Sequence, residues 1–481
     1  MDRRLPTRTE EIMDAIRRKA AARQLAPGDR LPSIRRYAAV MKVSPSTVVE
    51  AYDRLAAEGL IRARPGSGFY LTGHGLPPLS LTRPATSRAV DPFWVSRQSL
   101  DADADALKPG CGWLPADWMP NEALRRGLRN LARGEEEVLA DYGSTRGSLP
   151  LRRLLLGRFG EEGLQLSSEQ LLLTSSGTQA VDLVCRFLLQ PGDTVLVDDP
   201  CYFNFRALLR AHQLRLLSVP YTATGPGIAA FEALVSAERP RLYITNSALH
   251  NPTGASLSPQ SAYRLLSIAT AYDMTIVEDD IFADFEPDPS PRLAVLDGLD
   301  RVIRVGSFSK TLSASVRCGY IAARPDWIEG LVDLQIATSF GGPSPLAAGL
   351  IADILAGGGY RKHMEEVRRR LAAARRTVAP RLEALGIRPW LMPRGGFYLW
   401  CRLPQGADPA ELSRLALTEG VVLAPGNVFS VAQTAGEFMR FNVAQMHEPR
   451  IYDVLDRALR ALRQAEPAGS GAATLVSGAS G

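Results

Sequence analysis

The chain has 481 residues, 46% hydrophobic and 22% charged, with a net charge of +5. This length exceeds one ordinary domain, so two or more hydrophobic cores are expected in a globular protein. There is no apolar run of membrane-spanning length and no signal-peptide core, so a cytoplasmic location is expected. The five cysteines are scattered and form no Cys-x-x-Cys pair, so they indicate neither a disulfide framework nor a zinc ribbon.

The basic excess is confined to the start of the chain. Residues 1–72 carry 14 lysines and arginines against 8 aspartates and glutamates, whereas residues 73–481 carry 42 against 43. Such a segment suits a surface that binds nucleic acid phosphates. Charge alone is equally compatible with an ordinary solvated basic surface.

The first 72 residues predict three helices and a hairpin. Apolar residues at helical spacing predict a helix over Thr9–Gln24, and Ser33 caps a second short helix. Ser44, followed by a proline, caps a third helix that ends at Gly59. The segment Leu60–Leu71 reads as two strands around a Pro-Gly-Ser-Gly turn. Together these elements predict a winged helix-turn-helix over residues 9–72.

The rest of the chain divides into three parts. Residues 73–107 contain four prolines that interrupt any helix, Pro77, Pro78, Pro84 and Pro92, and predict an extended linker. Residues 108–465 are globular, with a smaller α/β subdomain from about Arg361 on. Residues 466–481 are rich in Gly, Ala and Ser and predict a disordered tail.

Short apolar runs alternate with helical segments in the globular part. The runs are Leu171–Thr174, Thr194–Val197, Leu242–Thr245, Met274–Val277 and Val302–Val305. Each ends in a loop rich in Ser, Gly, Asp or Asn. This pattern predicts a mostly parallel sheet covered by helices, with ligands bound at the carboxyl ends of the strands.

Several spaced blocks in the basic segment resemble the GntR superfamily of winged-helix regulators. They are Leu31–Arg36, Val43–Val48, Ala51-Tyr52, Glu58–Leu60 and Gly66–Phe69. The resemblance implies that the third helix enters the major groove of DNA and that the hairpin follows the minor groove. A winged helix that binds protein is the less favoured alternative, given the charge asymmetry.

The resemblance also implies which residues contact DNA. They are Arg35 and Arg36 at phosphates, Ser44, Ser46 and Thr47 at the start of the third helix, and Arg64 and Ser67 in the hairpin. Many relatives carry an arginine where this chain has Pro45, so a bidentate arginine–guanine contact is absent there. The phosphate contacts are therefore the firmer part of this prediction.

Motifs in the globular part meet the chemical demands of pyridoxal phosphate (PLP). The aldehyde of PLP needs an amine, its pyridine nitrogen a carboxylate, and its phosphate N–H donors and a cation. Lys310 ends Ser307-Phe308-Ser309-Lys310, with Arg317 seven residues on, and Asp279 ends a predicted strand. The turn Ser176-Gly177-Thr178 precedes a helix, whose N-terminus suits a phosphate.

Each motif alone also has an ordinary structural explanation. Lys310 would be an exposed lysine, Ser176–Thr178 a helix cap, and Tyr202 a core aromatic. The turn His250–Gly254, which contains Asn251, would serve only as a turn. The pair Asp279-Asp280 would bind a metal, although no third ligand is evident. Their joint occurrence in this order favours a PLP pocket.

This set of motifs resembles the fold type I PLP-dependent aminotransferases over about Lys108–Leu462. With the N-terminal segment, the whole chain resembles MocR-type regulators, in which a GntR-type winged helix-turn-helix is fused to an aminotransferase-like domain. The predicted fold is therefore multidomain: a winged helix-turn-helix, then an α/β fold type I aminotransferase-like domain with a small C-terminal α/β subdomain.

The resemblance implies a role for each pocket residue. Lys310 would anchor the cofactor, Asp279 would pair with the pyridine nitrogen, Asn251 would bind the ring oxygen and Tyr202 would stack on the ring. The phosphate would be held by Ser176, Gly177, Thr178, Ser307, Ser309 and Arg317, and by Tyr142 of a neighbouring subunit. Arg440 would grip the carboxylate of a substrate or effector.

The chain departs from the aminotransferase pattern at Phe282. Many relatives have a tyrosine near this position whose hydroxyl also bonds the ring oxygen, and phenylalanine cannot donate that bond. This puts efficient transamination in doubt but not PLP binding.

The sequence thus favours a PLP-dependent DNA-binding transcriptional regulator. An amino acid or amine effector would displace Lys310 by forming an external aldimine. The expected partners are a double-stranded operator with two half-sites and a second copy of the chain in a homodimer, with no membrane. The alternative is an active aminotransferase with an accessory DNA-binding segment, and a structural adaptor is disfavoured because Lys310 is intact.

Overall fold

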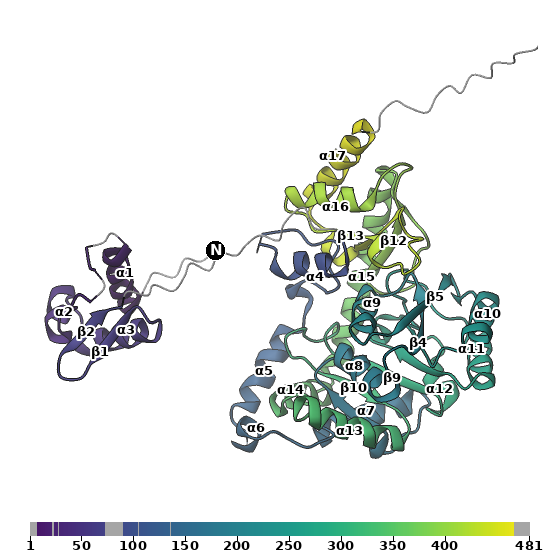
Figure 1. Ribbon diagram of the computed structural model, residues 1–481, viewed down its shortest axis with the longest axis horizontal. Coiled ribbons are helices and arrows are strands. Elements are labelled where there is room, and N and C mark those ends of the chain that lie inside the picture. The colour runs from purple at the N-terminus through teal and green to yellow at the C-terminus, as the bar shows by residue number, and fades with distance from the viewer. Residues whose placement is uncertain are drawn as a thin grey trace, which may run out of the picture. The chain divides into compact units, whose positions relative to one another are not determined.

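The computed structural model describes residues 7–21, 24–26, 28–72, 90–103, 105–134 and 136–465. The chain divides into two compact units, Met1–Ala85 and Thr86–Gly481, drawn in Figure 1. We call the described residues of the first unit the head and those of the second the body. Each has its own hydrophobic core.

The head is a winged helix-turn-helix, which confirms the prediction. Its elements are α1 (Arg8–Ala21), α2 (Ile34–Met41), α3 (Pro45–Ala57), β1 (Ile61–Arg64) and β2 (Gly68–Leu71). Ser33 and Ser44 cap α2 and α3 as expected, because each side-chain oxygen accepts a hydrogen bond from a first-turn backbone N–H. The strands β1 and β2 pair antiparallel, and Tyr52 lies in the core, where its hydroxyl donates to the Pro32 carbonyl over 2.8 Å.

The body is built on an eight-stranded sheet in the order β3-β10-β9-β8-β7-β4-β5-β6. The strands are β3 (Leu171–Thr174), β4 (Thr194–Asp199), β5 (Arg215–Thr222), β6 (Gly225–Pro226), β7 (Leu242–Thr245), β8 (Thr275–Asp279), β9 (Val302–Ser307) and β10 (Gly319–Ala322). The central strands β9, β8, β7, β4 and β5 are parallel, as predicted. The strand β10 lies antiparallel between β3 and β9, which the sequence pattern did not predict.

Helices cover both faces of this sheet (Figure 1). The helices up to the C-terminal subdomain are α5 (Asn121–Leu131), α6 (Glu136–Ala140), α7 (Leu149–Glu161), α8 (Gly177–Leu188), α9 (Phe203–Ala211), α10 (Ile228–Glu238), α11 (Pro259–Ala271), α12 (Leu293–Asp297), α13 (Pro325–Ser339) and α14 (Pro345–Ala356). Alternate side chains of one strand enter two different cores: Leu242 and Ile244 pack with α8 and α13, whereas Tyr243 packs with α7 and α11. Burial on both faces explains why these strands are continuous apolar runs.

The C-terminal subdomain is a small α/β unit, as predicted. Its four-stranded sheet has the order β11-β12-β14-β13. Its elements are α15 (Gly359–Ala384), β11 (Arg388–Pro389), β12 (Tyr398–Arg402), α16 (Pro409–Thr418), β13 (Ala424–Pro425), β14 (Phe438–Asn442) and α17 (Pro449–Ala465). Among the helices that the structure describes, none is long and apolar enough to cross a membrane.

Part of the segment predicted as an extended linker is a helix. The helix α4 (Pro92–Asp101) begins where the Asp91 carboxylate accepts a hydrogen bond from the Trp94 backbone N–H over 2.7 Å. Pro92 starts this helix instead of interrupting it, because a proline in the first turn lacks only an N–H that would be unpaired anyway. Trp94 is 2% exposed and packs in a cluster with Trp400 and Phe429. Residues 73–89 and the predicted tail, residues 466–481, lie outside the described residues.

A buried ionic cluster fixes the end of β8. The Asp280 carboxylate lies 2.8 Å from Arg292 Nε and 2.6 Å from Arg304 Nη2, and all three side chains are at most 7% exposed. Arg304 also reaches Glu162 over 2.6 Å. Removing one partner from such a cluster leaves an uncompensated buried charge.

We therefore expect Arg304→Met to destabilise the body by about 3–5 kcal/mol, because Asp280 then keeps only Arg292, which it shares with Glu286, and the buried cluster is one positive charge short. The denaturant midpoint of unfolding of the full chain measures this. Arg324→Met is the matched control, since Arg324 pairs with Asp326 at the surface, and it should leave the midpoint nearly unchanged. Equal midpoints for the two variants would show that the buried cluster is not needed for stability.

Candidate functional site

A cavity of about 370 Å³ lies at the carboxyl ends of β8 and β9 and brings the predicted pocket residues together. Its lining includes Ser176, Gly177, Thr178, Tyr202, Asn251, Asp279, Ser307, Ser309, Lys310, Arg317 and Arg440. Tyr142 is the exception, because it does not line this cavity. Its side chain is 80% exposed and its ring packs edge-on against Phe340.

Lys310 lies on the loop after β9 with its amine inside the cavity. Its Nζ donates a hydrogen bond to the Gly112 carbonyl oxygen over 2.6 Å. Burial, helped by the positive charge of Arg440, lowers the pKa of Lys310 from 10.5 to about 8. The amine is therefore neutral in a useful fraction of molecules near neutral pH, as a nucleophile toward an aldehyde must be.

Asp279 lies at the end of β8 and lines the cavity, whereas its two neighbours are occupied elsewhere. The Glu278 carboxylate accepts hydrogen bonds from the backbone N–H groups of Leu293 and Ala294, and Asp280 belongs to the ionic cluster. Burial raises the pKa of Asp279 to about 7. A protonated pyridine nitrogen beside it would favour the carboxylate form. The alternative of a metal on Asp279 and Asp280 loses its basis, because Asp280 is already neutralised by two arginines.

Hydroxyl and N–H groups gather at the N-terminus of α8. The Ser176 side chain caps this helix by accepting a hydrogen bond from the Gln179 backbone N–H over 3.0 Å. Ser307 Oγ lies 2.9 Å from Ser309 Oγ, and Arg317 lines the same cavity. Arg317 forms no hydrogen bond or ion pair within the described chain, so a cation and helix N–H donors remain available to an anion. This donor set fits a phosphate.

Arg440 lines the cavity and is held by two hydrogen bonds. One guanidinium nitrogen donates to Asn251 Oδ1 over 2.8 Å and the other to the Gly110 carbonyl over 2.7 Å. The group lies 4.2 Å from the centre of the Tyr398 ring, which favours a cation. Arg440 is 1% exposed, and its Nε has no hydrogen-bond partner among the described residues. A buried guanidinium with an unused N–H is suited to a ligand carboxylate.

Tyr202 and Phe282 complete the aromatic part of the lining. Tyr202 packs against Phe203 and Phe205, with ring centres 5.0 and 5.4 Å apart. Phe282 is 2% exposed, and its ring lies edge-on to Phe397. The position that departs from the aminotransferase pattern is thus at the cavity, where it offers no hydroxyl.

Sequence reasoning did not identify several residues of this site. Gly112 accepts the hydrogen bond from Lys310, and a β-carbon on it would lie 3.1 Å from the Tyr398 hydroxyl and 3.7 Å from Lys310 Nζ. Tyr398 carries Arg440 on its ring face, and the helix α4 forms a further wall. The glycines at 110 and 112 were a weak signal, and nothing local distinguishes Tyr398 from a core residue of β12.

The predicted DNA-binding residues lie at the surface of the head. Arg35, Arg36, Ser44, Ser46 and Arg64 are exposed, and Thr47 and Ser67 are half-buried. The Ser44 hydroxyl lies 2.7 Å from that of Ser46, so these side chains also organise the start of α3. The Arg64 guanidinium packs 4.5 Å from the centre of the Tyr70 ring, which holds it on the hairpin.

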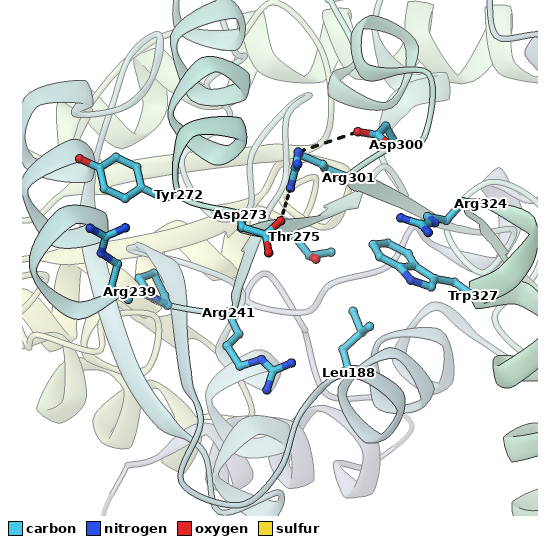
Figure 2. Close-up of a pocket in the computed structure, with 11 residues that line it drawn as sticks. Leu188, Arg239, Arg241, Tyr272, Asp273, Thr275, Asp300, Arg301, Arg324 and Trp327 are labelled. Carbon is cyan, nitrogen blue, oxygen red and sulfur yellow. Dashed lines mark hydrogen bonds and ion pairs between the residues drawn. The ribbon is translucent and has the colours of Figure 1, made fainter.

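A larger cavity, of about 570 Å³, lies at the other, amino ends of the parallel strands (Figure 2). Arg241 and Arg301 directly precede β7 and β9. Arginines that line this cavity already have acidic partners. Arg301 pairs with Asp273 over 2.7 Å (Figure 2). Arg324 binds Asp326 through two nitrogens at 2.7 and 2.8 Å. The lining contains no lysine. This cavity therefore lacks the amine that an aldehyde cofactor requires.

Comparison with known proteins identifies a related family for each of the two units. The family described as "Aminotransferase class I and II" matches residues 115–458, and that described as "Bacterial regulatory proteins, gntR family" matches residues 8–71. The chain is 29% identical over 450 residues to the HTH-type transcriptional regulator YdcR of Escherichia coli, covering 90% of this chain and 94% of that protein. It is 26% identical over 414 residues to the regulator NorG of Staphylococcus aureus, covering 83% and 92%.

Solved structures resemble the body. The α-aminoadipate aminotransferase LysN of Thermus thermophilus, solved with N-(5'-phosphopyridoxyl)-L-leucine, superposes with a TM-score of 0.71 and 28% identity, covering 77% of this chain and 95% of that one. The kynurenine aminotransferase of Pyrococcus horikoshii superposes with a TM-score of 0.68 and 25% identity, covering 75% and 91%. With the donor set described above, this likeness identifies PLP as the cofactor of the pocket. The chain therefore belongs to the class I and II aminotransferase family and, through its GntR-type head, has the domain organisation of MocR-type regulators.

Proposed function

We propose that this PLP-dependent, DNA-binding transcriptional regulator senses an amino acid in the pocket of its body. The observation that carries the proposal is the combination of a low-pKa amine, Lys310, with a buried guanidinium, Arg440, in one cavity of a chain that has a DNA-binding head. The first group suits a cofactor aldehyde and the second a carboxylate. The similarity to the HTH-type transcriptional regulators YdcR and NorG extends over 94% and 92% of those proteins and so covers both units.

In this proposal each of the predicted cofactor-binding residues of the cavity has one task toward PLP. Bound PLP supplies an aldehyde that reacts with primary amines. Lys310 anchors the aldehyde, Asp279 pairs with the pyridine nitrogen, Asn251 donates to the ring oxygen and Tyr202 stacks on the ring. The phosphate is held by Ser176, Gly177, Thr178, Ser307, Ser309 and Arg317.

The effector competes with Lys310 for the aldehyde, and its carboxylate binds Arg440. Binding of the effector changes DNA affinity only if it favours one arrangement of the chain over another. The regulator acts as a homodimer on an operator with two half-sites. The exposed Tyr142 then reaches the phosphate held by a neighbouring subunit, which accounts for its absence from the cavity of its own chain.

Replacing the anchor lysine tests the sensing part of this proposal. In the PLP-loaded full-length protein, an effector amino acid should change the affinity for DNA from upstream of its own gene. Lys310→Ala should abolish covalent attachment of PLP and the response, while DNA binding without effector persists. Gel-shift titration with and without amino acids measures both. Steady turnover of an amino donor and a keto acid, with no DNA binding at moderate salt, would instead favour the aminotransferase alternative.

The pKa of Lys310 predicts how fast apo protein captures PLP. An amine reacts only in its neutral form, so the capture rate should rise about tenfold per pH unit below pH 8. It should level off above about pH 8, because the pKa of Lys310 is lowered to about 8. Stopped-flow absorbance measures the rate. A rate that keeps rising from pH 9 to pH 10 would mean an ordinary, solvated lysine.

The head predicts a salt effect that does not depend on DNA sequence. Arg35→Ala with Arg36→Ala should weaken binding to specific and unrelated DNA alike and reduce the slope of log affinity against log salt by about 2, because two phosphate contacts are lost. Fluorescence anisotropy at several salt concentrations measures the slope. Arg133→Ala, at an exposed position of the body, is the control. An unchanged slope in the head variant would contradict the proposed orientation of α2.

A further inference from the structure

One wall of the pocket consists of side chains with no task toward PLP. Val95, Ser96, Ser99 and Leu100 of α4 line the cavity, and Asn204, Phe205 and Leu208 of α9 line it next to them. The two helices pack together through a shared cluster that holds Trp94 and Phe203. This wall, which we call the α4 wall, contains only apolar side chains and neutral polar ones.

The charges in the cavity are few. Among its lining residues only Asp279, Lys310, Arg317 and Arg440 have an acidic or basic side chain. In the proposed function Asp279 pairs with the pyridine nitrogen, Lys310 binds the aldehyde and Arg317 binds the phosphate. Arg440 remains, and it matches one carboxylate. Within this chain, no other described lining residue carries an opposite charge for a second charged group on a ligand.

We propose that the effector is an α-amino acid with a single carboxylate and an uncharged side chain, and that the α4 wall selects this side chain. The inference rests on the proposed function, since it takes Lys310 and Arg440 as the groups that hold the amine and the carboxylate. A carboxylate or ammonium on the effector side chain would lose water at the α4 wall without gaining an opposite charge. A neutral side chain meets apolar contacts and neutral hydrogen-bonding groups instead.

Pairs of amino acids with equal shape and different charge test the proposed class. The PLP-loaded full-length protein is titrated with glutamine and glutamate, and with norleucine and lysine, while cofactor absorbance reports binding. The neutral member should bind at least about tenfold more tightly in each pair, because burying an unpaired charge weakens binding by at least this factor. Equal affinities within the pairs would overturn the inference and leave the proposed function standing. If no amino acid changes the absorbance, the proposed function itself fails, and the inference with it.

A pair of variants on one helix tests the role of α4. Leu100 lines the cavity and is 74% exposed, so an arginine there can place a cation at the rim without disturbing the core. Phe93 lies on the same helix, is 53% exposed and does not line the cavity. Leu100→Arg should reduce the glutamine-to-glutamate preference by at least about tenfold, by pairing with the side-chain carboxylate. Phe93→Arg should leave it unchanged.

The outcomes separate a local contact from a general charge effect. A preference that shifts equally in both variants would mean that added charge acts at a distance, and a preference that shifts in neither would mean that α4 does not contact the effector. Either result would overturn the assignment of the α4 wall. Melting temperatures of the two variants, compared with the parent protein, confirm that both remain folded.

Discussion

The account depends on the burial of an amine and a carboxyl group in one cavity at the carboxyl ends of β8 and β9. Burial moves both groups toward neutrality, so the pKa of Lys310 falls to about 8 and that of Asp279 rises to about 7. Lys310 Nζ donates to the Gly112 carbonyl, and Asp279 Oδ1 accepts from the Ile281 backbone N–H over 3.4 Å, but neither group has an oppositely charged partner at salt-bridge distance among the described residues. A ligand with an aldehyde and a basic ring nitrogen engages both groups, which fits the PLP cofactor.

The surrounding fold serves to hold these groups in place. Three successive carboxylates at the end of β8 have three separate tasks: Glu278 holds the start of α12, Asp279 lines the cavity and Asp280 lies between two arginines. Arg440 is fixed by Asn251 and by the Tyr398 ring, so its unpartnered Nε–H has a defined direction. Preorganised groups of this kind recognise a carboxylate at little cost in side-chain entropy.

Local sequence signals predicted much of this structure, whereas the features that depend on long-range contacts could not be predicted. Caps such as Ser33 and Ser44, and apolar runs such as Leu242–Thr245, depend on neighbouring residues and could be read directly. The antiparallel insertion of β10, the contact of Lys310 with Gly112 and the position of Tyr398 depend on residues far apart in the chain. The helix α4 departs from the predicted linker because Pro92 lies in the first turn, where a proline is favourable and does not interrupt a helix.

The central claim is that Lys310 is the anchor that an effector displaces. The chain has four other lysines, Lys19, Lys42, Lys108 and Lys362. Borohydride reduction of PLP-loaded protein, followed by peptide mass spectrometry, locates the attached cofactor directly. The label should be on Lys310 alone, and adding an effector before reduction should move it from Lys310 to the free amino acid over the same concentrations that change DNA affinity. A label on another lysine, or one that stays on Lys310 while DNA affinity changes, would contradict the account.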